Sequence, residues 1–330
     1  MKRNYVRRKD RWSFITAVLF LLIFATMSAK ANEPTIEIEP ISDCPRMKLY
    51  QEVEYTSRLP WYQIAAIDQY ERNIATFRKS PALELVYDAL SIRIDPDVWS
   101  GPVSPNQYES CPAMIAMFGG IGLDGDGDGI ADINNEIDVL YTMVEYIRNY
   151  ETFEDAVKAY YPKEEAARLI LGIARLFEHF GTIELGERAF PVSKWNSYSY
   201  SDGYGCARSW GGCRAHEGID IFANYGATVV STSYGIVEVA GWNDYGGYRL
   251  GIRDIYNTYQ YYAHLQGFAD DIEVGMIVVP GQVIGSVGST GYGPEGTSGK
   301  FEPHLHFGLY KYDGRSEWAF NPYPHLVKWE

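Results

Sequence analysis

Two histidines that stand two residues apart, His304 and His306, are the first candidates for chemistry. They lie in the aromatic and branched segment 303–310 (PHLHFGLY), which is typical of a strand, in a chain that has 6 His among 330 residues. Side chains at positions i and i+2 of a strand point to the same face, about 7 Å apart. This spacing allows one imidazole to bind an ion while its neighbour acts on what is bound. Taken alone, such a pair is more often two core histidines.

Two more short segments of the same half carry histidines, namely HEGID (216–220) and YYAHL with His264. A zinc ion in an enzyme takes three protein ligands from His, Asp or Glu and leaves one position for water, so this inventory is sufficient. His216 and Asp220 flank Gly218, where a bend can bring both side chains to one ion. Glu217 is not expected to be the base of an H-E-x-x-H helix, because the residues that follow it are typical of strand and turn.

Together, HEGID, YYAHL and PHLHF resemble the lysostaphin/LytM-type zinc endopeptidases of bacterial cell walls, whose motifs are H-x(3)-D and H-x-H. The resemblance covers roughly residues 188–325. It implies Zn²⁺ as cofactor and peptidoglycan as substrate, in an all-β domain of the duplicated hybrid motif type. Carried over residue by residue, it implies that His216, Asp220 and His306 bind zinc and that His264 and His304 are the catalytic imidazoles. The division of roles between those two imidazoles stays open.

Three charged residues outside these motifs are interpreted separately. Arg208 stands eight residues before His216, and two interpretations stay open: a substrate-binding residue of the cleft, or a solvated or structural cation. His179 and His325 match no motif and are expected to be structural.

The chain has two halves with different residue patterns, which predict an α+β multidomain protein. Residues 55–77, 136–150 and 164–180 have apolar residues at helical spacing. After about residue 186, Gly and Tyr become dense and short β-rich runs alternate with turns. We therefore expect a helical domain over residues 32–185 and an all-β domain over residues 186–330.

The segment LDGDGDGIAD in the helical half resembles a calcium-binding loop. Asp124, Asp126 and Asp128 alternate, Gly129 follows, and Asp132 stands at the ninth position of the loop. The twelfth position holds Asn135 instead of Glu. Two interpretations stay open: a Ca²⁺ site, or a solvated acidic turn that caps the next helix.

The helical half also resembles lytic transglycosylases. In LPWYQIAAIDQYERN, Glu71 falls on the catalytic acid of that family, but Arg72 replaces the Ser that follows it, and Ser104 replaces a Gln expected after SGPV. A transglycosylase needs one carboxylic acid with a raised pKa in a dry pocket. We expect a lysozyme/transglycosylase-like domain that binds glycan or only packs, with Glu71 as a vestigial acid.

The N-terminus has the pattern of an export signal. A basic segment, an apolar run over residues 12–27 and the A-x-A pattern at 29–31 predict a cleaved signal peptide, or alternatively an N-terminal anchor. Residues 1–31 hold seven Lys/Arg and one acidic residue, so 22 basic and 42 acidic residues remain without them, a formal net charge of −20. This charge argues against nucleic acid as a partner. A membrane is expected as a partner only through an uncleaved N-terminal segment.

Four cysteines in an exported chain suggest two disulfides. The close spacing of Cys206 and Cys213 in a Gly-rich loop favours one bridge there and a second between Cys44 and Cys111. Free thiols remain an alternative, whereas a zinc cluster is disfavoured because no C-x-x-C spacing occurs.

The pairing of the two halves resembles the L-Ala–D-Glu endopeptidases of spore-forming bacilli. This resemblance implies an exported enzyme of the cell wall or spore cortex that acts in sporulation. Three alternatives stay open: a non-catalytic activator or binding protein of wall hydrolases, a bifunctional glycan-and-peptide hydrolase, and an endopeptidase for a different cross-link bond.

Overall fold

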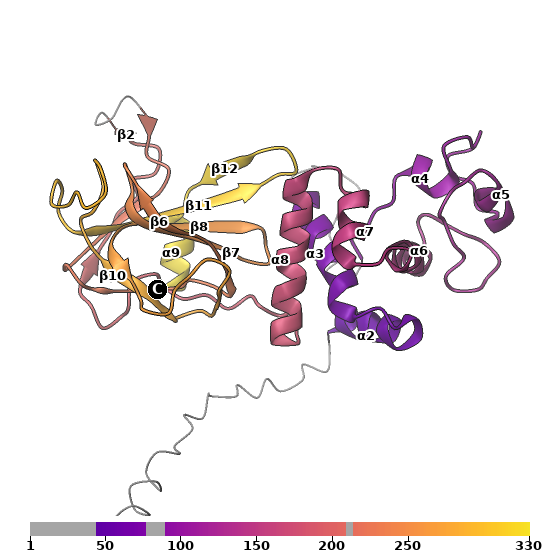
Figure 1. Cartoon of the computed structure of the whole chain (residues 1–330), viewed down its shortest axis with the longest axis horizontal. Coiled ribbons are helices and arrows are strands. Elements are labelled where there is room, and N and C mark those ends of the chain that lie inside the picture. Colours follow the sequence, from indigo (N-terminus) through magenta and orange to yellow (C-terminus); the bar gives the residue numbers. More distant parts are fainter. Residues whose placement is uncertain (1–43, 77–89, 209–213) are drawn as a thin grey trace, which may run out of the picture. The chain divides into compact units, whose positions relative to one another are not determined.

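The structure, a computed structural model, describes residues 44–76, 90–208 and 214–330, which belong to one compact unit, Ser42–Glu330 (Figure 1). The expected signal or anchor segment, residues 1–31, lies outside the described residues. No helix in the described part of the chain combines the length and the apolar character that a membrane crossing requires.

Helices occupy the N-terminal part of the described chain, and one more helix ends it. They are α2 (Pro45–Ser57), α3 (Trp61–Ala75), α4 (Pro96–Ser100), α5 (Pro112–Met117), α6 (Glu136–Arg148), α7 (Phe153–Tyr160), α8 (Glu164–Phe180) and α9 (Tyr323–Trp329). The buried apolar faces of α2 to α8 form one core, in which α3 packs against α8 and the ring of Trp61 stacks on Phe177. Leu326 of α9 belongs instead to the core of the strand-rich part.

The first helical segment that the sequence predicts, residues 55–77, is in fact interrupted. α2 ends at Ser57, Arg58 adopts a left-handed conformation with φ 66°, and α3 begins after Pro60. The cause is Pro60, because proline has no N–H to donate and disfavours helical geometry at the residue before it. The helices predicted over residues 136–150 and 164–180 are present as α6 and α8.

Apart from the final helix α9, the regular structure from residue 198 onward consists of strands. They are β1 (Tyr198–Ser199), β2 (Ala207–Arg208), β3 (Arg214–Ala215), β4 (Ile219–Ala223), β5 (Thr228–Val230), β6 (Gly235–Asn243), β7 (Gly247–Arg253), β8 (Thr258–Phe268), β9 (Ile277–Val278), β10 (Val283–Val287), β11 (His304–Tyr312) and β12 (Glu317–Phe320). All pairings are antiparallel. Ten strands form one sheet with the order β1-β4-β11-β8-β7-β6-β9, in which β12 pairs with β11 and β10 pairs with β5 and β8. β2 and β3 form a separate two-stranded sheet.

The central strands bury one face in a second apolar core. Ile219 and Ile221 of β4, Leu305 and Phe307 of β11, and Leu250 of β7 are all essentially inaccessible to solvent. Alternate residues of a strand point to opposite faces of the sheet. The residues between these apolar side chains therefore lie on the other face, which is free to carry polar groups.

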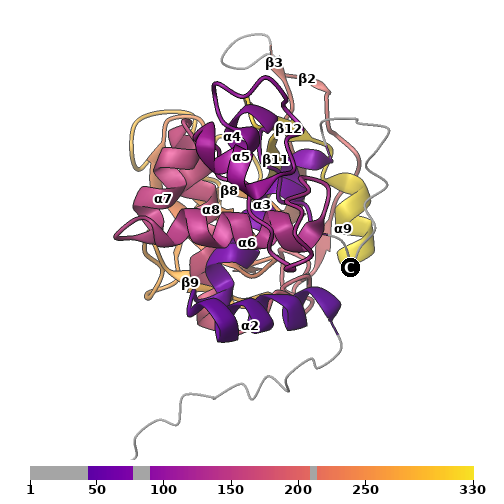
Figure 2. The same cartoon turned by 90° about the vertical axis from the view of Figure 1, so that its right-hand side faces the viewer.

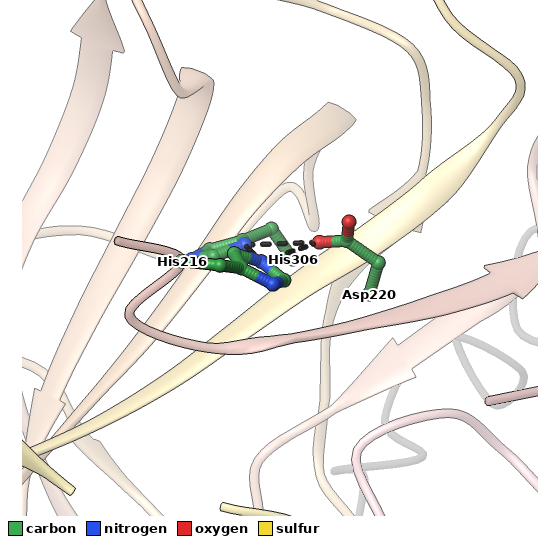
Figure 3. Close-up of side chains that lie close together, drawn as sticks. All are labelled: His216, Asp220 and His306. Carbon is green, nitrogen blue, oxygen red and sulfur yellow. Dashed lines mark hydrogen bonds and ion pairs between the residues drawn. The ribbon is translucent and has the colours of Figure 1, made fainter. Parts of the chain in front are cut away.

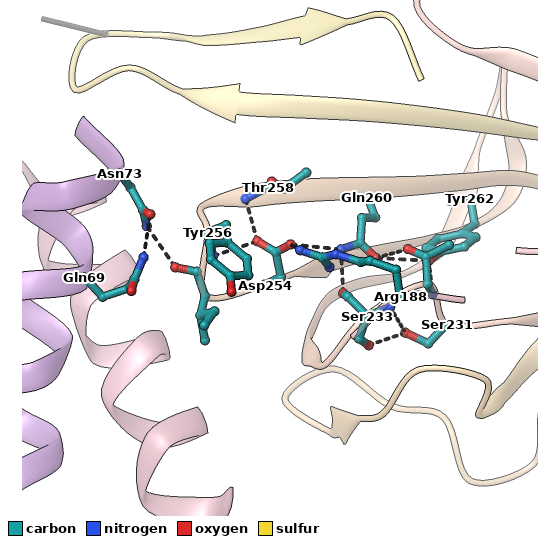
Figure 4. Close-up of polar contacts among 12 residues, drawn as sticks. Gln69, Asn73, Arg188, Ser231, Ser233, Asp254, Tyr256, Thr258, Gln260 and Tyr262 are labelled. Carbon is teal, nitrogen blue, oxygen red and sulfur yellow. Dashed lines mark hydrogen bonds and ion pairs between the residues drawn. The ribbon is translucent and has the colours of Figure 1, made fainter. Parts of the chain in front are cut away.

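The turn between β7 and β8 inserts into the helical core. Ile255 at this turn is fully buried and belongs to the apolar cluster of the helices, and its carbonyl accepts a hydrogen bond of 2.8 Å from Asn73 Nδ2 of α3 (Figure 4). Asp254 Oδ1 accepts backbone N–H groups of Tyr256 and Thr258, which fixes the turn. An apolar residue at a hairpin tip is buried here because the helices cover it.

The expected disulfide between Cys44 and Cys111 is wrong, since both are free cysteines. Cys44 precedes α2, which packs on α3, whereas Cys111 precedes α5, which packs on α4. α2 and α5 lie apart in both views (Figure 1 and Figure 2), and a disulfide requires Cα atoms within about 7 Å. Cys206 is likewise a free, exposed cysteine, so the expected bridge from Cys206 to Cys213 is not formed; Cys213 itself lies outside the described residues.

The buried hairpin tip leads to a stability prediction. Ile255→Ala removes a fully buried side chain from the helical core and should lower the free energy of unfolding by about 2–5 kcal/mol. Val274→Ala is the matched control, because Val274 is 61% exposed and its truncation should cost little. Equilibrium urea unfolding of both variants measures the difference. Equal stability of the two variants would show that the tip does not contribute to the helical core.

Candidate metal and catalytic site

The pairing of β4 with β11 brings a histidine opposite an aspartate. In this antiparallel register His306 faces Asp220 and His304 faces Phe222. The intervening Leu305 and Ile221 point into the core, so the two histidines and the aspartate share the opposite face. The expectation that His304 and His306 lie on one face of a strand is confirmed.

Three side chains from this region converge on a single point (Figure 3). His216 Nε2 lies 3.0 Å from His306 Nδ1 and 3.0 Å from Asp220 Oδ1, and His306 Nδ1 lies 3.0 Å from the same carboxylate oxygen. His216 stands just before β4, and the chain bends at Gly218 between it and Asp220. The structure thus brings together the three residues that the sequence assigns to zinc, and zinc binding by them stays a prediction.

Gly218 is required by this close approach. A Cβ atom at Gly218 would lie 2.6 Å from His306 Cε1 and 2.7 Å from its Nε2, closer than real Cβ contacts. The backbone therefore passes directly beneath the imidazole, and the missing side chain leaves room for the ring. This explains why a glycine stands between the two donor residues of HEGID.

The tautomer of His216 is set by a backbone partner. His216 Nδ1 lies 3.0 Å from the carbonyl oxygen of Gly203 and donates its N–H there, which leaves the lone pair of Nε2 directed at the cluster. Such a hydrogen bond to the remote ring nitrogen is what orients metal-binding histidines in general. Two backbone hydrogen bonds hold the neighbouring chain: the N–H of His216 donates to the carbonyl oxygen of Cys206, and the N–H of Gly205 donates to the carbonyl oxygen of His216.

The electrostatics of the cluster suit a cation. Burial raises the pKa of Asp220, but the close contacts of its carboxylate with the imidazoles of His216 and His306 outweigh this effect and hold that pKa well below its usual range. Burial lowers the pKa of His306, opposed by Asp220. Two imidazole nitrogens and one carboxylate oxygen with space beside them are a donor set that zinc accepts. The residues present therefore fit a zinc ion.

His264 lies beside the cluster in a strained backbone conformation. In the pairing of β7 with β8, Tyr248 lies opposite Leu265 and Leu250 lies opposite Tyr262, so β8 has one extra residue between these two pairs. His264 stands in the resulting bulge and has φ 62°. For a residue other than glycine this left-handed conformation is unusual, and such strain occurs often at functional sites. The bulge redirects the His264 side chain relative to its neighbours on the strand.

The two other candidate histidines, His264 and His304, lie next to each other. The rings of His264 and His304 have centroids 4.7 Å apart. His264 Nδ1 contacts Thr290 O at 2.8 Å and His304 Nδ1 contacts Glu302 O at 2.7 Å, so both rings donate this N–H to a carbonyl and keep Nε2 for other partners. Burial, followed by the nearby His304, lowers the pKa of His264 to about 3, so its ring is neutral at pH 7.

A cavity of about 900 Å³ adjoins both groups of histidines. Besides the five residues already described, its polar and aromatic lining is Glu217, Phe222, Asn243, Tyr245, Arg249, Tyr259, Tyr261, Tyr292, Phe301, Glu302, Tyr310 and Glu317. Its size suits a peptide segment of a few residues, and the histidines at its wall can act on a bound amide.

Glu217, His179 and His325 stay out of the cluster. Glu217 is exposed, accepts a hydrogen bond of 3.4 Å from Tyr310 and is followed by strand β4, so the rejection of an H-E-x-x-H helix is confirmed. His179 packs edge-on against Phe180 of α8, and His325 packs against Phe320 and Trp329.

Glu71 is buried on α3, where it accepts a hydrogen bond of 2.9 Å from Tyr161. Its neighbour Arg72, which stands where the resemblance expects Ser, pairs with the fully buried Asp68 at 3.4 Å. Asp68 also accepts hydrogen bonds from Tyr50 at 2.7 Å and Arg46 at 3.2 Å. Arg72 therefore contributes to a buried polar network inside the helical region.

The acidic loop brings three of its four expected aspartates together. One oxygen each of Asp124, Asp126 and Asp128 lies within 4.8 Å of the others, whereas Asp132 is not part of this group. Asp124 accepts N–H groups of Gly127 and Gly129, and Asn135 caps α6. These hydrogen bonds are what a satisfied acidic turn before a helix requires, and Ca²⁺ binding stays a prediction.

The side chain of Arg208 lies outside the described part of the structure, although its backbone pairs with Arg214 in the β2–β3 ribbon. Arg249 and Tyr292, which line the cavity, belong to none of the sequence motifs. A signal for Arg249 was present in GYRLGIRD, where two arginines alternate with Leu250 and Ile252 on one strand. The alternation therefore identifies the polar face of β7, but it does not show that this face lines the cavity.

Fold and site together define a class: a β-sheet protein with two imidazoles and a carboxylate that can hold a metal ion, and two more imidazoles at the same cavity. Comparison with known proteins gives the family. The model of Peptidase family M23 matches residues 214–322. The L-Ala--D-Glu endopeptidase of Bacillus subtilis (strain 168) is 50% identical over 323 residues, 96% of this chain and 97% of that protein.

Two further similarities concern the strand-rich part. Lysostaphin from Staphylococcus simulans is 34% identical over 137 residues, which cover 41% of this chain and 26% of that protein. The solved catalytic domain of lysostaphin from the same species is 34% identical, covers 39% of this chain and 92% of that chain, and has a TM-score of 0.32. The near-full-length relative, together with the match to the family model, places the chain in Peptidase family M23, and it is a peptidase.

The contact beneath His306 leads to a prediction for metal binding. Gly218→Ala should push the His306 ring out of place and weaken zinc affinity about tenfold or more, as other changes that misorient metal-binding histidines do. Gly267→Ala is the control, because no atom lies within 4 Å of a Cβ built there. Competition with a fluorescent zinc chelator measures the affinities. Wild-type affinity in a folded Gly218→Ala protein would contradict the proposed geometry.

Proposed function

We propose that this protein is a zinc-dependent endopeptidase of peptidoglycan that hydrolyses the L-Ala–D-Glu bond of the stem peptide. The observation that carries the proposal is the convergence of His216, Asp220 and His306 within 3.0 Å of one another beside the His264–His304 pair. The bond is supported by a relative that is 50% identical along nearly the whole chain and is named for it.

His216, Asp220 and His306 would hold the zinc ion, with the Gly203 carbonyl orienting His216. When bound, zinc supplies a Lewis acid for the scissile carbonyl and lowers the pKa of water toward neutrality. Asp220 contributes the negative charge of the donor set. Gly218 lets the backbone pass under His306 without displacing the ring.

His264 and His304 would serve as the catalytic imidazoles. A neutral ring with an available Nε2 can accept a proton and later deliver it to the leaving nitrogen. A ring N–H can stabilise the negative charge that develops on the carbonyl oxygen. The carbonyls of Thr290 and Glu302 keep both rings oriented through Nδ1, so the two imidazoles can divide these tasks between them.

The helical region would support the peptidase region rather than cut glycan. Glu71 is buried against Tyr161, and Arg72 takes part in the Asp68 network, which favours a packing role for both side chains. The region would hold the β7–β8 turn and bind glycan beside it. An active second hydrolase would require Glu71 to reach substrate.

We place the site of action outside the cytoplasm, in the cell wall or the spore cortex during sporulation. Peptidoglycan lies outside the membrane, and the N-terminal pattern of residues 1–31 predicts export by a signal peptide or an anchor. A non-catalytic binding protein would not need all five candidate residues at one cavity.

The proposed bond is tested by digestion of purified peptidoglycan followed by mass spectrometry of the fragments. Cleavage should leave single L-Ala residues on the glycan and release peptides with a D-Glu amino terminus. Chelation of zinc should abolish this activity, and Asp220→Ala should lose both zinc and activity because the donor set is then incomplete. Fragments cut at the cross-link with L-Ala–D-Glu intact would refute the bond, and full activity after exhaustive chelation would refute the metal.

The two imidazoles give a separate prediction. His264→Ala and His304→Ala should each fold and retain zinc but lose about a hundredfold or more in rate, because each removes a proton-transfer or charge-stabilising group. Circular dichroism and metal analysis establish folding and zinc content, and the rate of peptide release measures activity. His325→Ala, a histidine outside the cavity, is the matched control. Near-wild-type rates in both test variants would remove these residues from catalysis.

A further inference from the structure

The charges at the cavity are unequally distributed. Its described lining includes the carboxylates Glu217, Asp220, Glu302 and Glu317, and Arg249 is the one Lys or Arg among the described lining residues. A substrate with a negative group would therefore be repelled by most of this wall and attracted at one place.

Arg249 lies on the same sheet face as the histidine cluster, two strands away. It precedes the fully buried Leu250 on β7, and β8 lies between β7 and β11. Neighbouring strands are spaced by about 4.8 Å, so Arg249 and His306 are separated by about 10 Å across the sheet. The long arginine side chain together with one residue of a bound peptide can span this separation.

Two tyrosines from β8 occupy the space on either side of Arg249. A Cβ at Gly251 would lie 2.0 Å from the hydroxyl of Tyr259, and a Cβ at Gly246 would lie 2.3 Å from the hydroxyl of Tyr261. The two glycines thus leave room for rings that flank the arginine along β7. Burial raises the pKa of Tyr259 to about 12, and the neighbouring Arg249 charge opposes this rise.

The guanidinium of Arg249 is incompletely satisfied. Its Nε is buried and has no hydrogen-bond partner among the described residues. Arg253, on the same face of the same strand, differs: it pairs with Glu238 at 3.2 Å and Glu317 at 2.5 Å and lies over the ring of Tyr259. A buried donor without a partner is costly, so the contrast marks Arg249 as the arginine with capacity for an external acceptor.

We infer that Arg249 binds a carboxylate of the substrate next to the scissile amide and thereby selects acidic stem peptides. The inference rests on the proposed function and names its specificity residue. In the stem peptide, D-Glu is joined onward through its side chain, so its α-carboxylate stands free beside the L-Ala–D-Glu amide. The planar guanidinium matches a carboxylate with two parallel hydrogen bonds, and the α-carboxamide form of the same residue lacks the charge.

The test compares two synthetic peptides that differ in one group. One is L-Ala–γ-D-Glu–diamino acid with a free α-carboxylate, and the other carries an α-carboxamide there. Zinc-loaded wild-type protein should prefer the carboxylate peptide. Arg249→Gln should lower kcat/KM for the carboxylate peptide about 10- to 100-fold. It should change kcat/KM for the carboxamide peptide little, since only the charged acceptor loses its partner. Arg249→Lys should fall between the two, because it keeps the charge but not the fork.

A binding measurement accompanies the kinetics. Calorimetric titration of metal-depleted protein with the carboxylate peptide should show weaker binding for Arg249→Gln than for wild type. Arg175→Gln, an exposed arginine on α8, is the control and should match wild type in both assays.

The outcomes separate this inference from the proposed function. Wild-type protein that cuts neither peptide refutes the proposed bond. Two results would refute the role of Arg249 and leave the proposed L-Ala–D-Glu bond standing. One is equal cleavage of both peptides by the wild-type protein, and the other is an equal loss of kcat/KM on both peptides in Arg249→Gln.

Discussion

The antiparallel register of β4 with β11 is the constraint on which the site depends. It places His306 opposite Asp220. The adjacent pair, Leu305 and Ile221, points to the other face of the sheet and fills the core. A shift by one residue would turn both donors into the core and bring apolar side chains to the cavity. The buried apolar residues of the two strands therefore hold the donor atoms in place, and Gly218 allows His216 to join them.

The β7–β8 hairpin links the helical region to this site. Its tip, Ile255, is buried among the helices and bonded to Asn73, while its other end carries the bulge at His264. Behind the tip, Asp254 forms an ion pair of 2.6 Å with Arg188 (Figure 4). The hydrogen bond from Gln260 to Ser233 lies next to this pair. One hairpin thus joins helical packing at one end to the strained backbone of the candidate site at the other, so the helices have a structural role in the strand-rich part of the chain.

The acidic composition makes local cations important. Most charged residues at the cavity are carboxylates, and the arginines beside them differ in how far they are paired. Arg253 pairs with Glu238 of β6 and Glu317 of β12, whereas Arg249 retains an Nε without a hydrogen-bond partner among the described residues. The same residue type at two positions on one face of one strand therefore serves two different purposes, decided by which carboxylates reach it.

The sequence by itself determined the strand with His304 and His306, the bend at Gly218, the helices over residues 136–150 and 164–180, and the change to strands in the second half. These features follow from local periodicity and residue type, which act over a few neighbours along the chain. The resemblance of three short motifs to known endopeptidases predicted that His216, Asp220 and His306 meet, but only the tertiary structure decided the strand register that brings them within 3.0 Å. It alone decided that Ile255 is buried under helices and that Cys44 and Cys111 stay apart. It also decided which of two arginines on β7 is left with an open hydrogen-bond donor. Such outcomes depend on strand pairing between residues far apart in sequence, and short-range patterns carry no information about those distances.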